Sequence, residues 1–364
     1  MTPTLATEER PQADLWANPM GTDGFEFVEY STPEPRALRA LFEKLGFRAV
    51  ARHRSKAVTL FRQGDINFIL NDEPESHGAR FAQVHGPCAC AMAFRVKDAG
   101  QAYDKLLALG ATGVPSRSGP MELNIPAIEG IGGALVYLVD RYADADIYQV
   151  DFRPIEGVER RPPGYGLTYI DHLTHNVFRG NMDLWSGYYE RLFNFREIRY
   201  FNIEGKLTGL KSRAMTSPCG KIRIPINESS DDKSQIAEYL AQYHGEGIQH
   251  IALGTDDIYA TVERLRADGV TFMDTPDTYF ESVDRRLPGH GEDLGRLKAD
   301  RILIDGAPTE GQGILLQIFT DTVIGPIFFE LIQRKGNEGF GEGNFQALFD
   351  SIELDQIRRG TLTK

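Results

Sequence analysis

CAMAFRVKDAGQAYDKLLALG (90–110) and QHIALGTDDIYATVERLRADG (249–269) decide the fold, because they are two copies of one pattern, 159 residues apart. Each copy begins with a short apolar run typical of a strand. An aspartate in the N-cap position follows, then an amphipathic helix of about three turns, and a glycine that ends it. The sequence therefore predicts one strand and helix unit used at least twice.

A second, fainter pair supports the duplication. Residues 25–30 and 37–47 in the front half repeat the strand and helix order of residues 167–173 and 184–195. Further short runs typical of strands follow the helices, at 57–61, 66–70, 134–138 and 314–319. We therefore predict an α+β fold of four βαβββ modules, arranged as two domains of paired modules.

The expected domain boundary is the polar, proline-bearing stretch 153–164. Residues 1–23 are expected to form a loose extension. An N-terminal domain then covers residues 24–155, and a C-terminal domain covers residues 164–364.

The composition limits the possible functions. The 364 residues are 41% hydrophobic and 25% charged, which is typical of a folded globular chain. The net charge of −12 disfavours nucleic acid as a partner, and no apolar run is long enough to cross a bilayer. Three cysteines and the lack of a signal peptide favour the reducing cytoplasm.

Histidines on predicted strands are the first candidates for chemistry. His172 and His175 lie in IDHLTHNV (170–177), and their spacing on a strand places them on opposite faces, so at most one of them can join a given metal site. His250 lies on the first strand of the following unit, although a hydrogen-bonded core histidine is the commoner case. The front copies have Glu29 and Ala91 at the matched positions, which indicates an asymmetric site in the rear half.

Glu330 is the third candidate, in the apolar strand GPIFFELIQR (325–334). A buried carboxylate needs a cation. Arg334 could supply it as an ordinary salt bridge, and pairing 147–150 with 327–330 matches Glu330 with Val150. Two histidines and one carboxylate on strands together form the facial triad that non-haem iron(II) oxygenases use.

The C-terminal segment predicts a helix that begins at Asn344 as its cap, with apolar positions at 345, 348, 349, 352 and 357. The preceding glycine-rich stretch 339–343 lacks the pattern of a nucleotide-binding loop and suits a hinge. We expect this helix either to gate the site or to serve only as core packing.

Seven segments, in order, resemble the 4-hydroxyphenylpyruvate dioxygenase family of bacterial type, in the vicinal-oxygen-chelate superfamily. They are DHLTHNV (171–177), PINE (225–228), SQI (234–236), GIQH (247–250), LQIFT (316–320), FELIQR (329–334) and GFGEGNF (339–345). The resemblance covers about residues 24–357. It implies a glyoxalase-like open barrel in each domain and one iron(II) per chain, held by His172, His250 and Glu330, with His175 not a ligand. It further implies that the N-terminal domain has no metal site.

The resemblance also implies a reaction: 4-hydroxyphenylpyruvate and O2 become homogentisate and CO2, as a step of tyrosine and phenylalanine catabolism. Oxidative decarboxylation precedes attack on the ring and a shift of the side chain. The implied substrate-binding residues are Ser212, Asn227, Gln235, Gln249, Gln317, Phe319, Phe328, Phe340, Asn344 and Phe345. Simple alternation turns Gln249 away from the side of the strand that carries His250, so a twist or a bulge is needed to bring it in.

Three alternatives remain open. A 4-hydroxymandelate synthase would use the same substrate and iron but oxidise the benzylic carbon. An extradiol dioxygenase would cleave catechols, and a drug-sequestering protein of the same fold would lack the triad. A homo-oligomer, dimer or tetramer, is also expected.

Overall fold

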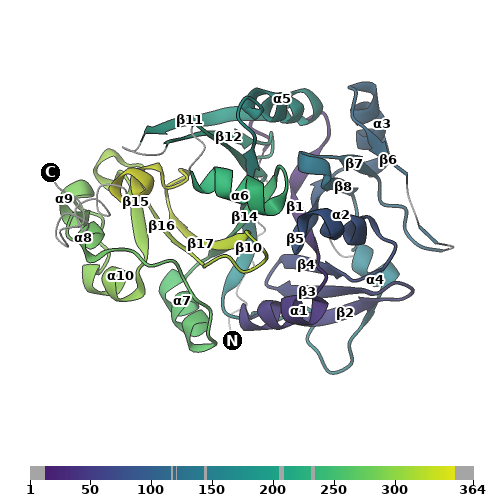
Figure 1. The fold of residues 1–364 in the computed structure, drawn as a ribbon, viewed down its shortest axis with the longest axis horizontal. Helices are drawn as coiled ribbons and strands as arrows, with labels where there is room; N and C mark the ends of the chain where they lie inside the picture. Colours follow the sequence, from purple (N-terminus) through teal and green to yellow (C-terminus); the bar gives the residue numbers. More distant parts are fainter. Residues whose placement is uncertain are drawn as a thin grey trace, which may run out of the picture.

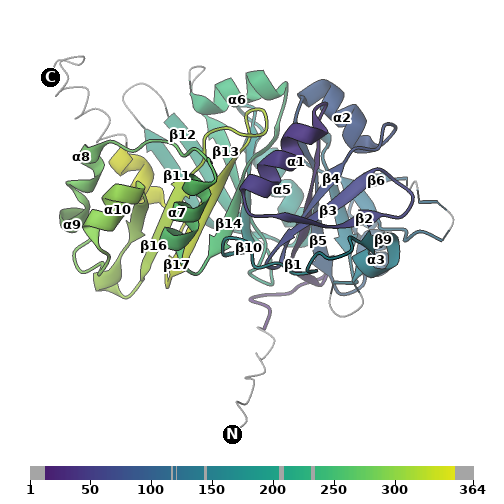
Figure 2. The same ribbon diagram turned by 90° about the horizontal axis from the view of Figure 1, so that it is seen from below.

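The computed structural model describes residues 13–115, 118–119, 121–142, 146–204, 209–230 and 234–348. Within these residues, two large sheets lie side by side, one from each half of the chain (Figure 1 and Figure 2). Strands β1 (Thr22–Ser31) and β5 (Cys88–Val96) of the first sheet and β10 (Leu167–Val177) and β14 (Gly247–Thr255) of the second lie toward the middle of the molecule. The prediction of an α+β fold built from two sheet domains is confirmed.

The N-terminal half contributes the remaining elements of the first sheet and its helices: α1 (Pro35–Lys44), β2 (Arg48–His53), β3 (Val58–Gln63), β4 (Ile66–Asn71), α2 (His77–His85), α3 (Ala99–Ala108), β6 (Gly113–Val114), β7 (Ala127–Glu129), the 3-10 turn η1 (Ile131–Gly133), β8 (Leu135–Val139), α4 (Ile147–Asp151) and β9 (Phe152–Pro154). Among the described residues the strand order is β6-β7-β8-β5-β1-β4-β3-β2-β9.

The C-terminal half contributes α5 (Met182–Phe193), β11 (Arg196–Glu204), β12 (Gly209–Thr216), β13 (Arg223–Ser229), α6 (Gln235–Tyr243), α7 (Ile258–Ala267), α8 (Asp277–Phe280), α9 (Val283–Arg286), α10 (Leu294–Asp300), β15 (Leu303–Gly306), the 3-10 turn η2 (Pro308–Glu310), β16 (Ile314–Phe319) and β17 (Phe328–Lys335). Its strand order over the described residues is β11-β12-β13-β10-β14-β17-β16-β15.

The two quoted copies fold alike for the same local reasons. Asp98 accepts a hydrogen bond from the backbone of Gln101 at the start of α3, and Asp257 accepts one from Ala260 at the start of α7. Gly110 and Gly269 follow the helices with φ of 86° and 81°, a backbone conformation that glycine adopts without strain. The predicted caps of the repeat are confirmed.

The central strands are paired in the same way in both sheets. β1 pairs antiparallel with β5 and parallel with β4, and β5 pairs parallel with β8. The second sheet repeats these three pairings: β10 pairs antiparallel with β14 and parallel with β13, and β14 pairs parallel with β17. Each first strand also contains an extra residue at the same point, Glu26 in β1 and Asp171 in β10, as a β-bulge.

The register of these ladders corrects two of the matched positions. In the first sheet, Phe27 comes directly after the bulge and pairs with Ala93. In the second sheet, His172 comes directly after the bulge and pairs with Ala252. The counterpart of His172 is therefore Phe27 and not Glu29. Glu29 corresponds to Thr174.

The counterpart of Glu330 is likewise not Val150. Tyr137 pairs with Ala93 as Glu330 pairs with Ala252, so Tyr137 occupies the matched position. Val150 lies in helix α4 instead of a strand, with 38% of its surface exposed. Gapped alignment of short apolar runs was the cause of both errors.

One face of each sheet is buried against helices and the other domain. Leu173, Ile251 and Phe329 belong to a single apolar cluster that includes residues of both halves. Within it Phe68 of β4 stacks on Phe329 of β17, with ring centroids 5.8 Å apart. The opposite face of each sheet, which in the second sheet carries His172 and Glu330, is called the inner face below.

Two terminal predictions need correction. Residues 1–12 lie outside the described residues, but residues 13–21 are attached to the C-terminal half: the Trp16 indole donates to the Asn194 carbonyl at 2.7 Å, and the Leu15 amide donates to the Pro218 carbonyl. At the other end the helix begins at residue 342, so Asn344 lies inside it and does not cap it. The continuation at 349–364 lies outside the described residues.

None of the helices in the described part of the chain is long and apolar enough to span a membrane.

Candidate metal centre

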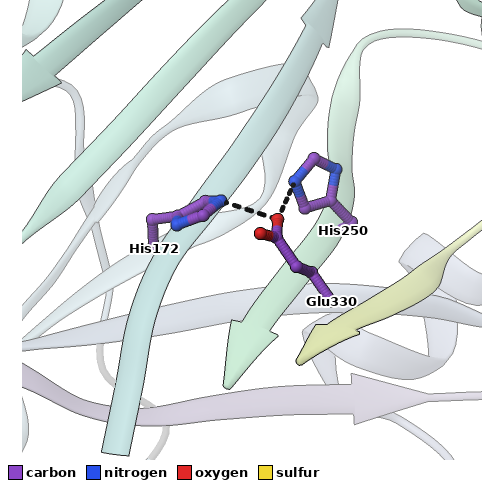
Figure 3. Close-up of side chains that lie close together, drawn as sticks. All are labelled: His172, His250 and Glu330. Atoms are coloured by element: carbon purple, nitrogen blue, oxygen red, sulfur yellow. Dashed lines mark ion pairs between the residues drawn. The ribbon is translucent and has the colours of Figure 1, made fainter. Parts of the chain in front are cut away.

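Three neighbouring strands bring the predicted triad together on the inner face of the second sheet (Figure 3). His172 of β10 and Glu330 of β17 both pair with Ala252 of β14. The three residues therefore form one row across the sheet, with Ala252 in the middle. His250 precedes Ala252 by two residues, so it shares the same face. The small Ala252 side chain leaves room between the ligands.

The three side chains converge on a common point. One ligand atom from each of His172, His250 and Glu330 lies within 4.8 Å of the other two, and all three residues are buried. His172 Nε2 and His250 Nε2 lie 3.2 and 3.4 Å from Glu330 Oε2 (Figure 3). Glu330 therefore pairs with the histidines, and the alternative of a simple bridge to Arg334 is not what the structure contains.

Arg334 instead holds Asp171, the bulged residue next to His172. Its guanidinium donates to Asp171 Oδ2 at 2.7 Å and to Oδ1 at 2.8 Å, and Arg223 adds a longer contact of 3.3 Å. His172 Nδ1 also lies 2.8 Å from Asp171 Oδ1. When a carboxylate accepts a hydrogen bond from Nδ1–H of a neutral histidine, Nε2 carries no proton and can bind a metal. Such a carboxylate partner is usual for a metal-binding histidine.

The charges of the site balance one another. Burial raises the pKa of Asp171, but the attraction and hydrogen bonds of Arg334 and His172 outweigh burial and hold that pKa well below its usual range. Burial likewise raises the pKa of Glu330, and the two histidines outweigh it and lower the pKa. The anionic Glu330 carboxylate and two imidazoles form a donor set suited to a divalent cation, and the Asp171 carboxylate supports one of those imidazoles from behind.

The pKa values of His172 and His250 are shifted in opposite directions. Burial lowers the pKa of His172, but the attraction of Glu330 and the hydrogen bond to Asp171 outweigh it and raise that pKa. Burial dominates at His250 and lowers its pKa. The surroundings of the two imidazoles therefore differ: Glu330 and Asp171 favour the charged form of His172, whereas burial favours the neutral form of His250.

Aromatic rings enclose the triad. Phe328 stacks on the His250 ring with centroids 4.8 Å apart, and Phe340 meets the His172 ring edge to face at 5.4 Å. Phe319 is paired with Glu330 across the ladder and lies 6.4 Å from the His250 ring. Three of the four predicted aromatic residues thus surround the triad; Phe345 is half-buried in the helix 342–348.

The predicted polar residues fall into two groups. Ser212 and Asn227 pair with each other across β12 and β13 on the inner face, and Gln317 lies there on β16, two residues from Phe319. Gln235, by contrast, is exposed on the first turn of α6. The described contacts do not bring Gln235 to the triad.

Gln249 is the bulged residue of β14. Thr174 pairs with His250 and His175 pairs with Ile248, which leaves Gln249 as an extra residue in its strand. Its side-chain oxygen lies 3.0 Å from His250 Nδ1. The bulge that this position required is therefore present, and it turns Gln249 toward the ligand.

Asn344 is buried in a polar contact behind the site. Its side-chain oxygen accepts hydrogen bonds from the Tyr279 hydroxyl at 2.5 Å and from Arg286 at 3.3 Å, while its Nδ2 has no partner in the described chain.

Asn176 was missed by the sequence analysis. It lies on β10 two residues beyond Thr174, paired with Asn227, and so shares the inner face with His172. Asn176 is fully buried, and neither side-chain atom has a hydrogen-bond partner in the described residues. A buried amide without a partner is costly, which indicates a ligand contact. Alternation from His172 was the signal that could have found it.

His175 lies on the opposite face. It is fully buried, and its Nε2 lies 2.7 Å from the Tyr189 hydroxyl, far from the metal-facing group. Burial lowers the pKa of His175 to about 3. Its role in the described structure is core packing.

The duplicated sheets and the two-histidine, one-carboxylate group together define the vicinal-oxygen-chelate class of enzyme. Family models agree: "Hydroxyphenylpyruvate dioxygenase, HPPD, N-terminal" matches residues 16–153, and "Glyoxalase/Bleomycin resistance protein/Dioxygenase superfamily" matches residues 169–283. The chain is 66% identical to 4-hydroxyphenylpyruvate dioxygenase of Pseudomonas aeruginosa, over 95% of this chain and 97% of that protein. It belongs to the 4-hydroxyphenylpyruvate dioxygenase family.

Other similar proteins also match nearly the whole of this chain, but they have different names. Hemolysin VllY of Vibrio vulnificus is 65% identical over 95% of this chain and 98% of its own length. Among solved structures, a xylose isomerase-like TIM barrel/4-hydroxyphenylpyruvate dioxygenase fusion protein shares 33% identity with a TM-score of 0.77, covering 94% of this chain and 53% of that one. A mutant of 4-hydroxymandelate synthase from Streptomyces coelicolor has a TM-score of 0.79 at 24% identity, covering 93% of this chain and all of that one, which shows the fold alone.

Proposed function

We propose that this chain converts 4-hydroxyphenylpyruvate and O2 to homogentisate and CO2, in tyrosine and phenylalanine catabolism, with iron(II) held by His172, His250 and Glu330. The observation that carries the proposal is the convergence of these three ligand atoms on one buried face. The high identity to a 4-hydroxyphenylpyruvate dioxygenase over nearly the full chain supports the choice of reaction.

The residues fit a metal ion. Glu330 Oε1 is buried and has no hydrogen-bond partner in the described chain, although Oε2 contacts both histidines. A buried carboxylate oxygen without a partner is costly, and a cation would satisfy it. When bound, iron(II) would supply the site for the oxo acid and dioxygen, and the redox chemistry.

The chain itself would orient the ligands and keep water out. Asp171 holds the proton of His172 on Nδ1, which leaves Nε2 free to bind. Phe328 and Phe340 cover the two imidazoles and exclude water from their edges.

We assign substrate contacts to the residues that share this face or border it: Ser212, Asn227, Gln249, Gln317, Phe319, Phe328, Phe340, Asn344 and Phe345. Asn176 joins them because its buried amide has no hydrogen-bond partner among the residues that the structure describes. Gln235 would need a movement of α6, since its side chain is exposed. Few polar groups on an otherwise aromatic wall suit a phenol with an oxo acid side chain.

The test is product analysis with 4-hydroxyphenylpyruvate as the sole organic substrate, in air with added iron(II). We expect homogentisate and CO2 in step with oxygen uptake, and no need for 2-oxoglutarate. Hydroxymandelate as the main product would favour the synthase, and activity on catechols alone would favour an extradiol enzyme. Glu330→Gln should lose activity, whereas the matched change Glu34→Gln, on the loop before α1, should not.

The remaining expectations are part of the same proposal. We place the protein in the cytoplasm as a homo-oligomer, with an N-terminal domain at 24–155 that holds no metal and a catalytic domain at 164–364. The C-terminal helix, described over residues 342–348, would act as a gate. A chain truncated before Asn344 should then retain iron but consume oxygen without matching homogentisate; coupled turnover in the folded truncated protein would exclude a gate.

A further inference from the structure

The inner face of the N-terminal sheet lines a partly open cavity of about 430 Å³ that the proposed reaction does not use. Its walls come from the strands that correspond to those of the metal centre, and they include Phe27, Ile69 and Tyr137. A cavity of this size is within the range that binds small organic molecules. The duplication has therefore produced a second cavity, without the triad, on the matched face of the first sheet.

The strand register shows what replaces the metal ligands there. Phe27, Ala91 and Tyr137 occupy the positions of His172, His250 and Glu330. The Phe27 and Tyr137 rings lie 5.6 Å apart at an angle of 48°. Two aromatic rings thus stand where the other domain would hold a cation with nitrogen and oxygen ligands.

A carboxylate remains in this cavity. Glu29 is 7% exposed, and the hydrogen bonds from Asn71, at 2.7 Å, and from Cys90, at 3.7 Å, both reach Oε1. No donor to Oε2 occurs among the described residues. Burial raises the pKa of Glu29, and the hydrogen bonds from Asn71 and Cys90 and the charge of Lys56 oppose this rise without cancelling it.

Among the described residues of the rim, no cation forms an ion pair or a hydrogen bond with Glu29, although the charge of Lys56 acts on it. Lys56 is paired with Glu122 at 2.8 Å. Burial lowers the pKa of both His53 and His77, so these rings are neutral near pH 7. The described lining residues include two permanent cations, Lys56 and Arg80, and five carboxylates, Glu29, Glu73, Glu75, Glu122 and Asp151, of which Asp151 is paired with Arg54 at 3.2 Å. This excess of negative charge favours a cationic ligand.

We propose that the N-terminal barrel binds a small organic cation with an aromatic body, its ammonium group on Glu29 Oε2 and its body against the Phe27 and Tyr137 rings. An ammonium beside a buried carboxylate forms a charge-assisted hydrogen bond, and aromatic faces attract it further. The site is separate from the metal centre and independent of the proposed reaction.

The test is calorimetric titration of the full-length, iron-loaded protein with 2-phenylethylamine. The neutral 2-phenylethanol and the anionic 3-phenylpropionate serve as matched ligands of similar size. We expect the amine to bind, and both of the others to bind at least about tenfold more weakly, since a charged partner is lost. Equal binding of the alcohol, or no binding of the amine, would overturn the proposal.

Variants locate the binding. Glu29→Gln removes the charge without a change in size and should weaken amine binding at least about tenfold. Glu34→Gln makes the same change outside the cavity lining and should leave binding unchanged. Val58→Phe should weaken binding by filling the cavity at a half-buried wall position, without touching Glu29. Amine binding that survives both Glu29→Gln and Val58→Phe would place the ligand elsewhere and refute the site.

Discussion

Asp171→Asn should weaken both the metal centre and the fold around it, because Asp171 connects Arg334 to His172. The carboxylate has no exposed side-chain surface and accepts the two hydrogen bonds of Arg334, whose side chain is 8% exposed. An asparagine keeps one oxygen acceptor but has no charge. Arg334 would retain its bonds to the carbonyls of Asn337 and Gly339, and at most one bond to the remaining amide oxygen in place of the two bonds to a charged carboxylate.

The expected magnitude follows from these contacts. Breaking a buried ion pair by removal of one partner costs about 3–5 kcal/mol, and the remaining acceptors at Arg334 favour the lower end. Loss of the carboxylate behind a metal-binding histidine reduces metal affinity about 10- to 100-fold. An affinity change of that size corresponds to about 1.4–2.7 kcal/mol.

Two measurements separate these effects. Urea unfolding of the metal-free protein reports stability, and anaerobic titration with iron(II) reports affinity. Asp183→Asn is the matched control, because Asp183 pairs with Arg213 but has 88% of its side chain exposed, so it should cost at most about 1 kcal/mol. If Asp171→Asn bound iron(II) as tightly as the wild-type protein, then Asp171 would not orient His172, and the reasoning would fail.

Three further predictions concern the same strands. His172→Ala should abolish iron retention while His175→Ala leaves most of it; the reverse pattern in measured iron content would show that the assigned face is wrong. Burial lowers the pKa of His175 in the folded chain to about 3, from an ordinary value of 6.5. Between these two pH values the unfolded chain binds a proton on His175, and the folded chain does not. Stability should therefore fall by up to about 1.4 kcal/mol per pH unit as the pH drops below 6.5, and His175→Gln should reduce that slope in urea unfolding between pH 7 and pH 5. Ala252→Leu should fill the space between His172 and Glu330 and lower iron content in a protein that still folds, whereas retention of full iron content by a folded variant would contradict the ligand row.

The sequence by itself determined the duplicated architecture and the three candidate metal ligands of the rear half. The copies at 90–110 and 249–269 carry their own strand pattern, cap and terminating glycine, so local preferences alone specify each unit. The residue types His172, His250 and Glu330 could be selected because a charged or titratable group in an apolar strand is costly unless it has a function or a partner. The family resemblance came from the same segments.

Only the tertiary structure decided which positions correspond and which side chains pair. Both first strands carry a bulge at the same point, at Glu26 and at Asp171, and the strand register around these bulges matches Phe27, and not Glu29, with His172. A bulge is fixed by hydrogen bonds to a neighbouring strand that is distant in sequence, so the local pattern does not reveal it.

Long-range pairing had the same effect on charge. Arg334 lies four residues from Glu330 in sequence, yet it binds Asp171, because alternation and sheet register bring those two side chains together. The orphaned amide of Asn176 and the cavity beside Glu29 likewise exist only once strands distant in sequence close around them, since burial is a property of the assembled sheets.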